Sequence, residues 1–239
     1  MNQPATGMVT LNGDRERLDN PAWFALNGRQ APLGEGGPLA RRFVPAVSPF
    51  AGLKSTTEAS LHALHALLAN GESAMLVTQG QIPTVAGLRT DYLFDVLQMI
   101  DTDLAGGDVE GDAVCLTRDD ADEMVALASR TEPGPFALRT LEMGRYIGLR
   151  REGRLIAMAG ERFQVGRFVE ISAVCVDAEH RGQGIAARLM NSLRRHIHEQ
   201  GGVPFLHVRS DALSTVRLYG KLGFVPRIRL NVYQATADR

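Results

Sequence analysis

Two glycines lie in a short segment that connects an apolar run to a periodic one. Residues 169–176 are mostly apolar, and Arg181-Gly182-Gln183-Gly184-Ile185-Ala186 follows them and opens the stretch Ile185–Gln200. Glycine lacks a Cβ, so the backbone here can approach a ligand closely. The first amides of a helix have no partner within the helix. A strand, turn and helix of this kind favour an anion, and a phosphate or pyrophosphate is the natural occupant.

Apolar periodicity predicts the helix that follows the turn. Four apolar residues recur at four-residue spacing: Ile185, Leu189, Leu193 and Ile197. They lie on one helix face, so this face is expected to be buried. The helix is expected to end at Gly201-Gly202, since glycine is common just past a helix end.

A second helix is expected after a short strand, Pro204–Val208. It is predicted to run from Asp211, as the N-cap residue, to Leu222, with Gly223 just past its end. The chain then finishes with a strand near Ile228–Gln234.

Three antiparallel strands are predicted before the glycine turn. Arg145–Arg151 and Arg154–Phe163 are separated by Glu152-Gly153, a strong signal for a two-residue hairpin. Phe168–Val176 is the third strand. Hairpins followed by strand, helix, strand, helix and strand predict an α+β fold, in which helices cover a mixed sheet.

The N-terminal half is less regular. The first fifty residues contain several prolines, the pair Gly36-Gly37 and little periodicity, so irregular structure is expected. Residues 55–70 are typical of a helix with Ser55 or Thr56 as its cap. A strand, Ser73–Gln79, and an apolar run, Tyr92–Ile100, follow.

The acidic, glycine-rich stretch Asp101–Asp112 is typical of a linker. A new strand is expected at Ala113–Leu116, and Thr117 caps a helix that runs to about Arg130. We therefore predict an N-terminal subdomain of residues 1–111, smaller and of α/β type, and a second domain of residues 112–239.

The composition is that of an ordinary globular protein, with 239 residues, 44% hydrophobic and 22% charged. No apolar run approaches the roughly 20 residues that span a bilayer, and no secretory signal is evident. A cytoplasmic protein without a membrane partner is expected. Cys115 and Cys175 each lie in an apolar run, where the expected role is a small buried hydrophobe. His62 and His65 share a predicted helix face without a third ligand, so no metal site is expected.

Charge is distributed unevenly. Residues 139–239 contain 17 Lys and Arg against 9 Asp and Glu, whereas residues 1–138 contain 9 against 18. A basic half fits a polyanionic ligand, and an alternative is that the two halves attract each other. No recognition helix or alternation of aromatic and basic residues is found, so a nucleic-acid partner is not expected.

Two motifs in the C-terminal half resemble the GNAT superfamily of acyl-CoA-dependent N-acetyltransferases. The glycine segment fits the family signature Gln/Arg-x-x-Gly-x-Gly/Ala, and Leu218-Tyr219-Gly220-Lys221-Leu222-Gly223-Phe224 looks like its second hallmark. A helix, a strand and a helix separate them, as in the family. The resemblance covers about residues 113–235 and implies a GNAT-like mixed sheet. On this basis we expect the N-terminal subdomain to be either a reduced GNAT-like half or a segment that covers the acceptor groove.

The resemblance implies a binding site for acetyl-CoA as the cosubstrate. Backbone amides around Gln183, Gly184, Ala186 and Ala187 would hold the pyrophosphate, and Arg181 would shape the loop together with Gly182 and Ile185. The strand Val174-Cys175-Val176 would lie along the pantetheine arm, with the Val174 amide polarising the thioester carbonyl. Many relatives have Asn where this chain has Ala212. A side-chain contact to the cofactor is therefore missing.

Acetyl transfer to an amine requires a proton acceptor, because an amine with a pKa of ~10 is mostly protonated at neutral pH. Glu170 is the candidate. Strand alternation predicts that it shares a face with Val174, about 13 Å away, a distance that suits a relay through water. Phe168-Val169-Glu170-Ile171 also resembles the Phe-x-Glu-Ile pattern that holds a catalytic glutamate in histone-acetylating relatives. The alternative is a structural carboxylate paired with an arginine such as Arg145 or Arg167.

Tyr219 is the candidate general acid for the departing thiolate, and its alternative is a buried tyrosine that packs the helix on the sheet. Together these residues predict an N-acetyltransferase that works by direct attack of a primary amine in a ternary complex. The amine belongs to a small molecule or a peptide, and a homodimer is compatible with the sequence. Two rival functions stay open. One is a non-catalytic acyl-CoA sensor on the same fold, and the other is a nucleotide enzyme, whose loop would need a Lys-Ser/Thr pair absent here.

Overall fold

Eleven strands form one mixed sheet in the computed structural model, which describes residues 15–102 and 107–238. The strands are β1 Gly34–Gly36, β2 Ala40–Phe43, β3 Phe50–Leu53, β4 Ser73–Thr78, β5 Leu88–Asp101, β6 Val114–Cys115, β7 Tyr146–Arg151, β8 Arg154–Val165, β9 Phe168–Val176, β10 Val203–Arg209 and β11 Phe224–Ala237. The α-helices are α2 Pro21–Leu26, α3 Glu58–His65, α4 Ala121–Thr131, α5 Ile185–Glu199 and α6 Leu213–Lys221. Short 3₁₀ turns occupy Arg17–Asp19, Ala31–Leu33, Arg118–Asp120, Thr140–Met143 and Ala178–His180. No helix in these ranges is long and apolar enough to cross a membrane.

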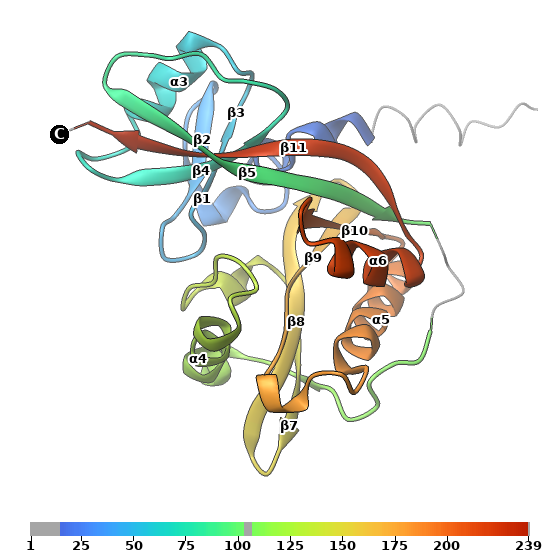
Figure 1. The fold of residues 1–239 in the computed structure, drawn as a ribbon. Coiled ribbons are helices and arrows are strands. Elements are labelled where there is room, and N and C mark those ends of the chain that lie inside the picture. Colours follow the sequence, from blue (N-terminus) through green and yellow to red (C-terminus); the bar gives the residue numbers. More distant parts are fainter. Residues whose placement is uncertain (1–14, 103–106, 239) are drawn as a thin grey trace, which may run out of the picture.

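The sheet runs through both halves of the chain. Its strand order is β1-β2-β3-β4-β11-β5-β10-β9-β8-β7-β6, so the C-terminal strand β11 lies between two strands of the N-terminal half. Figure 1 shows the long strands β5 and β11 side by side, reaching from one half of the molecule to the other. Backbone pairing thus crosses the boundary predicted at residue 111. The division into residues 1–111 and 112–239 stays a prediction.

Helices α4 and α5 lie on opposite sides of strand β8 (Figure 1). Alternation along this strand explains why, since Ala157 and Ala159 join the apolar cluster under α5 while Met158 joins the cluster under α4. All four residues predicted to form the apolar face of α5 are buried, as expected from their spacing. The predicted hairpin is also confirmed, because Glu152 and Gly153 both have positive φ between β7 and β8.

A β-bulge interrupts strand β9. Gly160 pairs with Ser172 and Met158 pairs with Cys175, so two residues of β9 oppose one residue of β8. Ala173, at this point, has a φ of 52°. A bulge shifts the alternation of side chains by one.

The bulge corrects one prediction about the site. Ile171 and Val174 both pack on the α5 side of the sheet, whereas Glu170 lies on the other face. Glu170 and Val174 were predicted to share a face. That prediction is wrong because alternation was counted without the extra residue.

The N-terminal segment is more ordered than predicted. Residues 17–53 form α2 and strands β1 to β3, and Phe43 and Phe50 pack on Phe163 of strand β8. These strands have three or four residues, too few for a visible alternation. Residues 1–14 and 103–106, in the predicted irregular start and linker, lie outside the described residues.

Two predicted helix caps are wrong. Thr57, rather than Ser55 or Thr56, caps α3, and its hydroxyl accepts a hydrogen bond from the Ser60 amide at 3.4 Å. Helix α6 has Ala212 at its N-cap position without a side-chain cap. The Asp211 carboxylate is instead paired with Arg209 of strand β10, at 2.7 Å.

Candidate active site

The glycine turn has the predicted strand, turn and helix arrangement. Gly182 and Gly184 have φ values of 78° and 73°, in the left-handed region that favours glycine, and residues 181–184 are exposed. A Cβ at Gly182 would meet no atom within 4 Å, so the turn faces open space. Arg181 Nε donates to the Val176 carbonyl at 3.2 Å and ties the turn to the end of β9.

Helix α5 presents its first amides at this turn. Gly184 is its N-cap residue and supplies no side-chain cap. The Arg188 amide bonds to the Gly184 carbonyl at 3.1 Å, which leaves the amides of residues 185–187 as the unpaired first turn of the helix. Arg188 Nη1 also donates to the Gln183 carbonyl at 2.9 Å. The turn is therefore held in shape while its amides point outward, as an anion site requires.

A groove leads from the turn along strand β9. Its volume is about 220 Å³. Five of the predicted cofactor residues line it together with Thr131 of α4: Val174, Cys175, Val176, Arg181 and Ala186. The groove exists because strands β9 and β10 pair only as far as Glu170 and Phe205 and then separate. Beyond that point, backbone groups of β9 that face β10 have no strand partner.

A second cavity adjoins this groove. It measures about 410 Å³ and shares Val174 and Thr131 with the groove. One wall comes from α6 and includes Tyr219, and polar residues of its floor include Arg162 and His207. Further lining residues come from strands β3, β4, β5 and β11. The two compartments thus meet at Val174 and Thr131.

Glu170 lies behind this cavity in a buried ion pair. Its carboxylate is fully buried and accepts from Arg162 Nε at 2.9 Å and Nη2 at 2.6 Å, while His207 Nδ1 lies 2.6 Å away. Burial by itself would raise the pKa of Glu170, but the charges and hydrogen bonds of Arg162 and His207 lower the pKa to about 2. The predicted partners, Arg145 or Arg167, are therefore wrong. Arg162 replaces them because it lies on the antiparallel neighbour β8.

The hydrogen bonds around His207 define its tautomer. Arg227 can only donate, so Gln98 Oε1, 3.0 Å from Arg227 Nη1, must be the acceptor of that bond. The Gln98 nitrogen then faces His207 Nε2 at 3.0 Å and the Leu18 carbonyl at 2.8 Å. His207 Nε2 is consequently the acceptor, and Nδ1 carries the proton that is donated to Glu170. Sequence analysis did not select His207, although it alternates with Arg209 on a strand that borders the site.

Tyr219 lies on the face of α6 that borders the cavity, together with Ala212 and Thr215. Its ring packs on Phe224 with centroids 6.2 Å apart. Burial raises the pKa of its phenol to about 12. Among the described residues no group forms a hydrogen bond with its hydroxyl, which is therefore available to a ligand in the cavity.

Cys175 is not suited to be a nucleophile, and Cys115 lines neither compartment. Cys175 is buried, and burial raises the pKa of its thiol, which disfavours the reactive thiolate. Cys115 is exposed, so the prediction that it is buried is wrong; its strand β6 has only two residues at the sheet edge. No cluster of three or more potential metal-binding side chains is found in the part of the chain that the structure describes.

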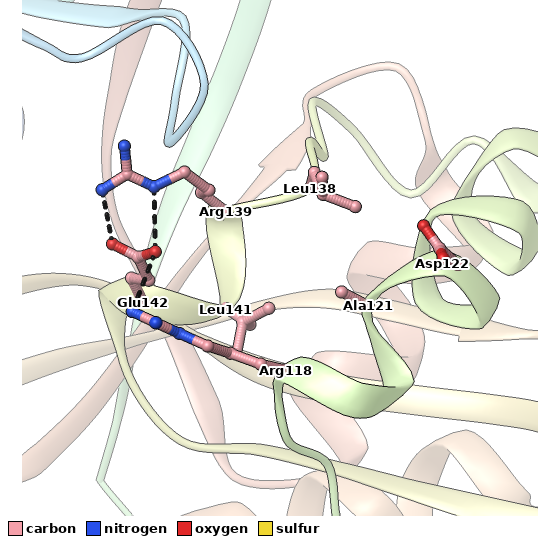
Figure 2. A pocket seen from close by; sticks show the side chains of 7 residues that line it. All are labelled: Arg118, Ala121, Asp122, Leu138, Arg139, Leu141 and Glu142. Carbon is pink, nitrogen blue, oxygen red and sulfur yellow. Dashed lines mark hydrogen bonds and ion pairs between the residues drawn. The ribbon is translucent and has the colours of Figure 1, made fainter.

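A further cavity of about 440 Å³ lies between the start of α4 and the turn Thr140–Met143 (Figure 2). Figure 2 shows that Arg118 and Arg139 both point to the Glu142 carboxylate, at 3.3 Å and 2.9 Å. Both arginines of this cavity are thus paired with Glu142, and none of the predicted site residues lines it. We therefore assign the site to the two compartments that meet at Val174.

Comparisons with known proteins identify the family of the chain. The model of the acetyltransferase (GNAT) family matches residues 115–224. The N-alpha-acetyltransferase RimI of Mycobacterium tuberculosis is 32% identical over 121 residues, which cover 46% of this chain and 75% of that protein.

Solved structures extend the likeness over nearly the whole chain. A GNAT-family structure from Novosphingobium aromaticivorans is 36% identical, with a TM-score of 0.86 over 93% of this chain and 99% of that chain. A GCN5-related N-acetyltransferase from Kribbella flavida shares the fold at 17% identity, with a TM-score of 0.59 over 98% of this chain and 96% of that one. This chain therefore belongs to the GNAT family of acetyltransferases and is an acetyltransferase enzyme.

Proposed function

We propose that this enzyme transfers the acetyl group of acetyl-CoA to a primary amine by direct attack in a ternary complex. The observation that carries the proposal is the meeting of two compartments at Val174. One compartment leads to an exposed turn of helix N-terminal amides, and the other is large enough for a second small molecule. An acyl donor and an amine can thus be bound at once, with their reacting groups at the junction.

The glycine turn is suited to the diphosphate of coenzyme A. We assign the amides of Gln183 and of residues 184–187 to this group, with Arg181 holding the turn. Backbone groups of Val174–Val176 that lack a strand partner then bind the pantetheine arm as a neighbouring strand would. Acetyl-CoA supplies an activated thioester at the junction, and the Val174 amide is placed to polarise its carbonyl. The raised pKa of the Cys175 thiol supports direct attack over an acetyl-cysteine intermediate.

Tyr219 is assigned as the group that faces the leaving sulfur. A phenol with a pKa of about 12 keeps its proton at neutral pH. It is a weaker acid than a thiol, whose pKa is ~8.5, so full proton transfer to the thiolate is unfavourable. The role that fits is a hydrogen bond that strengthens as negative charge develops on sulfur.

His207 is assigned as the proton acceptor, with Glu170 as its positioning residue. A carboxylate with a pKa of about 2, already bound to Arg162, is a poor base. It can, however, hold the Nδ1 proton of His207 and stabilise the ring when Nε2 takes a second proton. Nε2 becomes free for the amine when its contact with Gln98 opens. The general-base role predicted for Glu170 is thus proposed to act through His207.

The test is steady-state release of coenzyme A from acetyl-CoA in the presence of amines, with mass detection of the acetylated product. Intersecting initial-velocity lines are expected for a ternary complex, and parallel lines would indicate a covalent intermediate. A non-catalytic acyl-CoA sensor, favoured only by the missing side chain at Ala212, would bind coenzyme A without consuming acetyl-CoA.

A matched pair of glycine variants tests the phosphate site. Gly182→Ala and Gly201→Ala both place alanine at a left-handed φ, 78° and 73°, where its Cβ meets nothing within 4 Å. Both are expected to lose about 1–2 kcal/mol of stability. Only Gly182→Ala should weaken coenzyme A binding measured by calorimetry, because Gly201 lies past the far end of α5. Equal binding by the two variants would refute the assignment.

A further inference from the structure

Part of the cavity lining is an apolar stripe across four strands. Strand register places Val77, Val232 and Phe94 directly opposite one another on β4, β11 and β5. Phe50 and Met75 are likewise paired on β3 and β4. Directly paired residues share one face of a sheet. We define the apolar stripe by its cavity-lining members: Phe50, Met75, Val77, Phe94, Val96 and Val232.

Two members of the apolar stripe remain partly exposed toward the cavity. Phe50, Val77, Val96 and Val232 are buried, whereas Met75 and Phe94 are only partly buried. The stripe continues the main apolar cluster of the N-terminal half, which α2 covers elsewhere. In the cavity, Arg162 lies over the Phe50 ring at 5.0 Å and Arg209 lies over the Phe94 ring at 4.6 Å, while Phe94 and Met75 keep part of their surface exposed. A ligand that lies on the stripe therefore removes apolar surface from water.

The charged groups of the cavity are mostly neutralised already. Three charged side chains line the cavity within the described ranges: Glu132, Arg162 and Arg209. Arg162 is paired with buried Glu170, and Arg209 is paired with Asp211 at 2.7 Å. Glu132 is exposed and is the single acidic side chain of the lining. A substrate with one ammonium group can therefore pair with Glu132. Further ammonium groups of the same substrate would lie near Arg162 and Arg209.

We propose that the acceptor is a small amine with one positive charge and an apolar group, aromatic or branched aliphatic, that lies on the apolar stripe. This inference rests on the proposed function and names the substrate class of the same site. It excludes polyamines, because their further charges have no carboxylate in the cavity. It also predicts that each buried methylene of the acceptor raises kcat/KM by about fourfold.

The experiment compares kcat/KM for 2-phenylethylamine, isopentylamine, ethylamine, spermidine and a short peptide with a free N-terminus. We expect 2-phenylethylamine and isopentylamine to exceed ethylamine by at least about tenfold. Phe94→Ala and Met75→Ala remove side chains that line the cavity, and both should reduce this ratio. Leu93→Ala is the matched control, because this residue of β5 does not line the cavity and is 39% exposed. It should leave the ratio unchanged.

The outcomes separate the two proposals. Higher kcat/KM for ethylamine, spermidine or the peptide would overturn the substrate class while leaving the acetyltransferase proposal intact. An unchanged ratio in both Phe94→Ala and Met75→Ala would also overturn the substrate class and leave the acetyltransferase proposal intact. Two variants are used so that the test holds if one of them does not fold. Acetylation of no amine, by a protein that still binds coenzyme A, would refute the proposed function and the substrate class together.

Discussion

Replacement of Glu170 by glutamine removes one charge from a largely buried ion pair. Glu170 is 0% exposed and the Arg162 side chain is 12% exposed. Glutamine has nearly the same shape, so packing is kept while the guanidinium of Arg162 loses its counter-charge. Removing one partner of a buried pair is more destabilising than removing both, because the remaining charge stays buried without compensation.

The magnitude follows from the carboxylate's titration. Its pKa is 4.5 without the protein environment and about 2 in the folded chain. A shift of one pKa unit corresponds to 1.36 kcal/mol, so the pair contributes about 3 kcal/mol at neutral pH. Losses of about 3–5 kcal/mol for broken buried pairs agree with this value. We therefore expect Glu170→Gln to lower the free energy of unfolding by about 3 kcal/mol at pH 7.

The assay is urea denaturation of wild type and variant over a pH series. A carboxylate whose pKa is lowered by folding stabilises the protein above its unfolded pKa. This stabilisation is lost as the pH falls through the folded pKa. The difference between Glu170→Gln and wild type should thus be constant above about pH 5 and shrink between about pH 4.5 and pH 2.

Two controls make the result decisive. Asp91→Asn breaks a pair in which both side chains are at least half exposed, and it should change stability by about 0–1 kcal/mol. Adding Arg162→Met to Glu170→Gln should restore at least half of the lost stability, since it removes the unpaired charge. A loss below about 1 kcal/mol in Glu170→Gln, or no recovery in the double variant, would refute the reasoning.

Other perturbations test the remaining parts of the site. Tyr219→Phe should lower kcat by about 10–100-fold, as expected for loss of a hydrogen bond to developing charge, with little change in the binding of coenzyme A; an unchanged kcat with weaker binding would contradict the role. His207→Gln should lower kcat by about 100-fold or more, and an unchanged kcat would show that the amine loses its proton to another acceptor. Ala212→Asn should raise the Tm by about 1–4 °C by capping α6, which differential scanning calorimetry can measure.

The parts of the site that were predictable depend on neighbours in sequence. The turn around Gly182 and Gly184, the helix that follows it and the hairpin at Glu152-Gly153 all have their structural causes within a few residues. Positive φ at glycine and an apolar helix face are visible in the sequence itself. For this reason the predicted bounds of strand β9, Phe168–Val176, agree with the structure.

Features that depend on distant pairing were not predictable. The place of β11 between β4 and β5 requires contacts across more than a hundred residues. The bulge at Ala173 has no local sequence signal, since a φ of 52° is unusual for alanine and is imposed by pairing with β8. The choice of Arg162 as the partner of Glu170 likewise originates in strand register. Asp211 is a local exception: it is a favourable N-cap residue in isolation, but Arg209, two residues before it, pairs with its carboxylate.

Charge asymmetry between the halves also acquires a structural explanation. Arg194 of the basic helix α5 donates from Nε and Nη2 to Asp101 at 2.7 and 2.8 Å, and the two side chains are nearly inaccessible. Arg188 is paired with Glu110 at 2.9 Å, so a second arginine of α5 holds an acidic residue of the N-terminal half. These pairs show that attraction between the halves accounts for part of the charge asymmetry.

The ion pair between Arg194 and Asp101 also connects the two compartments of the site. Strand β5 carries Phe94 in the apolar stripe and Asp101 at its end, about 23 Å further along at ~3.3 Å per residue. Asp101 is bound to α5, the helix whose first turn is the proposed phosphate site. One strand thus holds the proposed acceptor wall in a defined position relative to the proposed donor helix. Direct transfer needs such rigidity, because the reacting atoms must be brought within about 3–3.5 Å of each other.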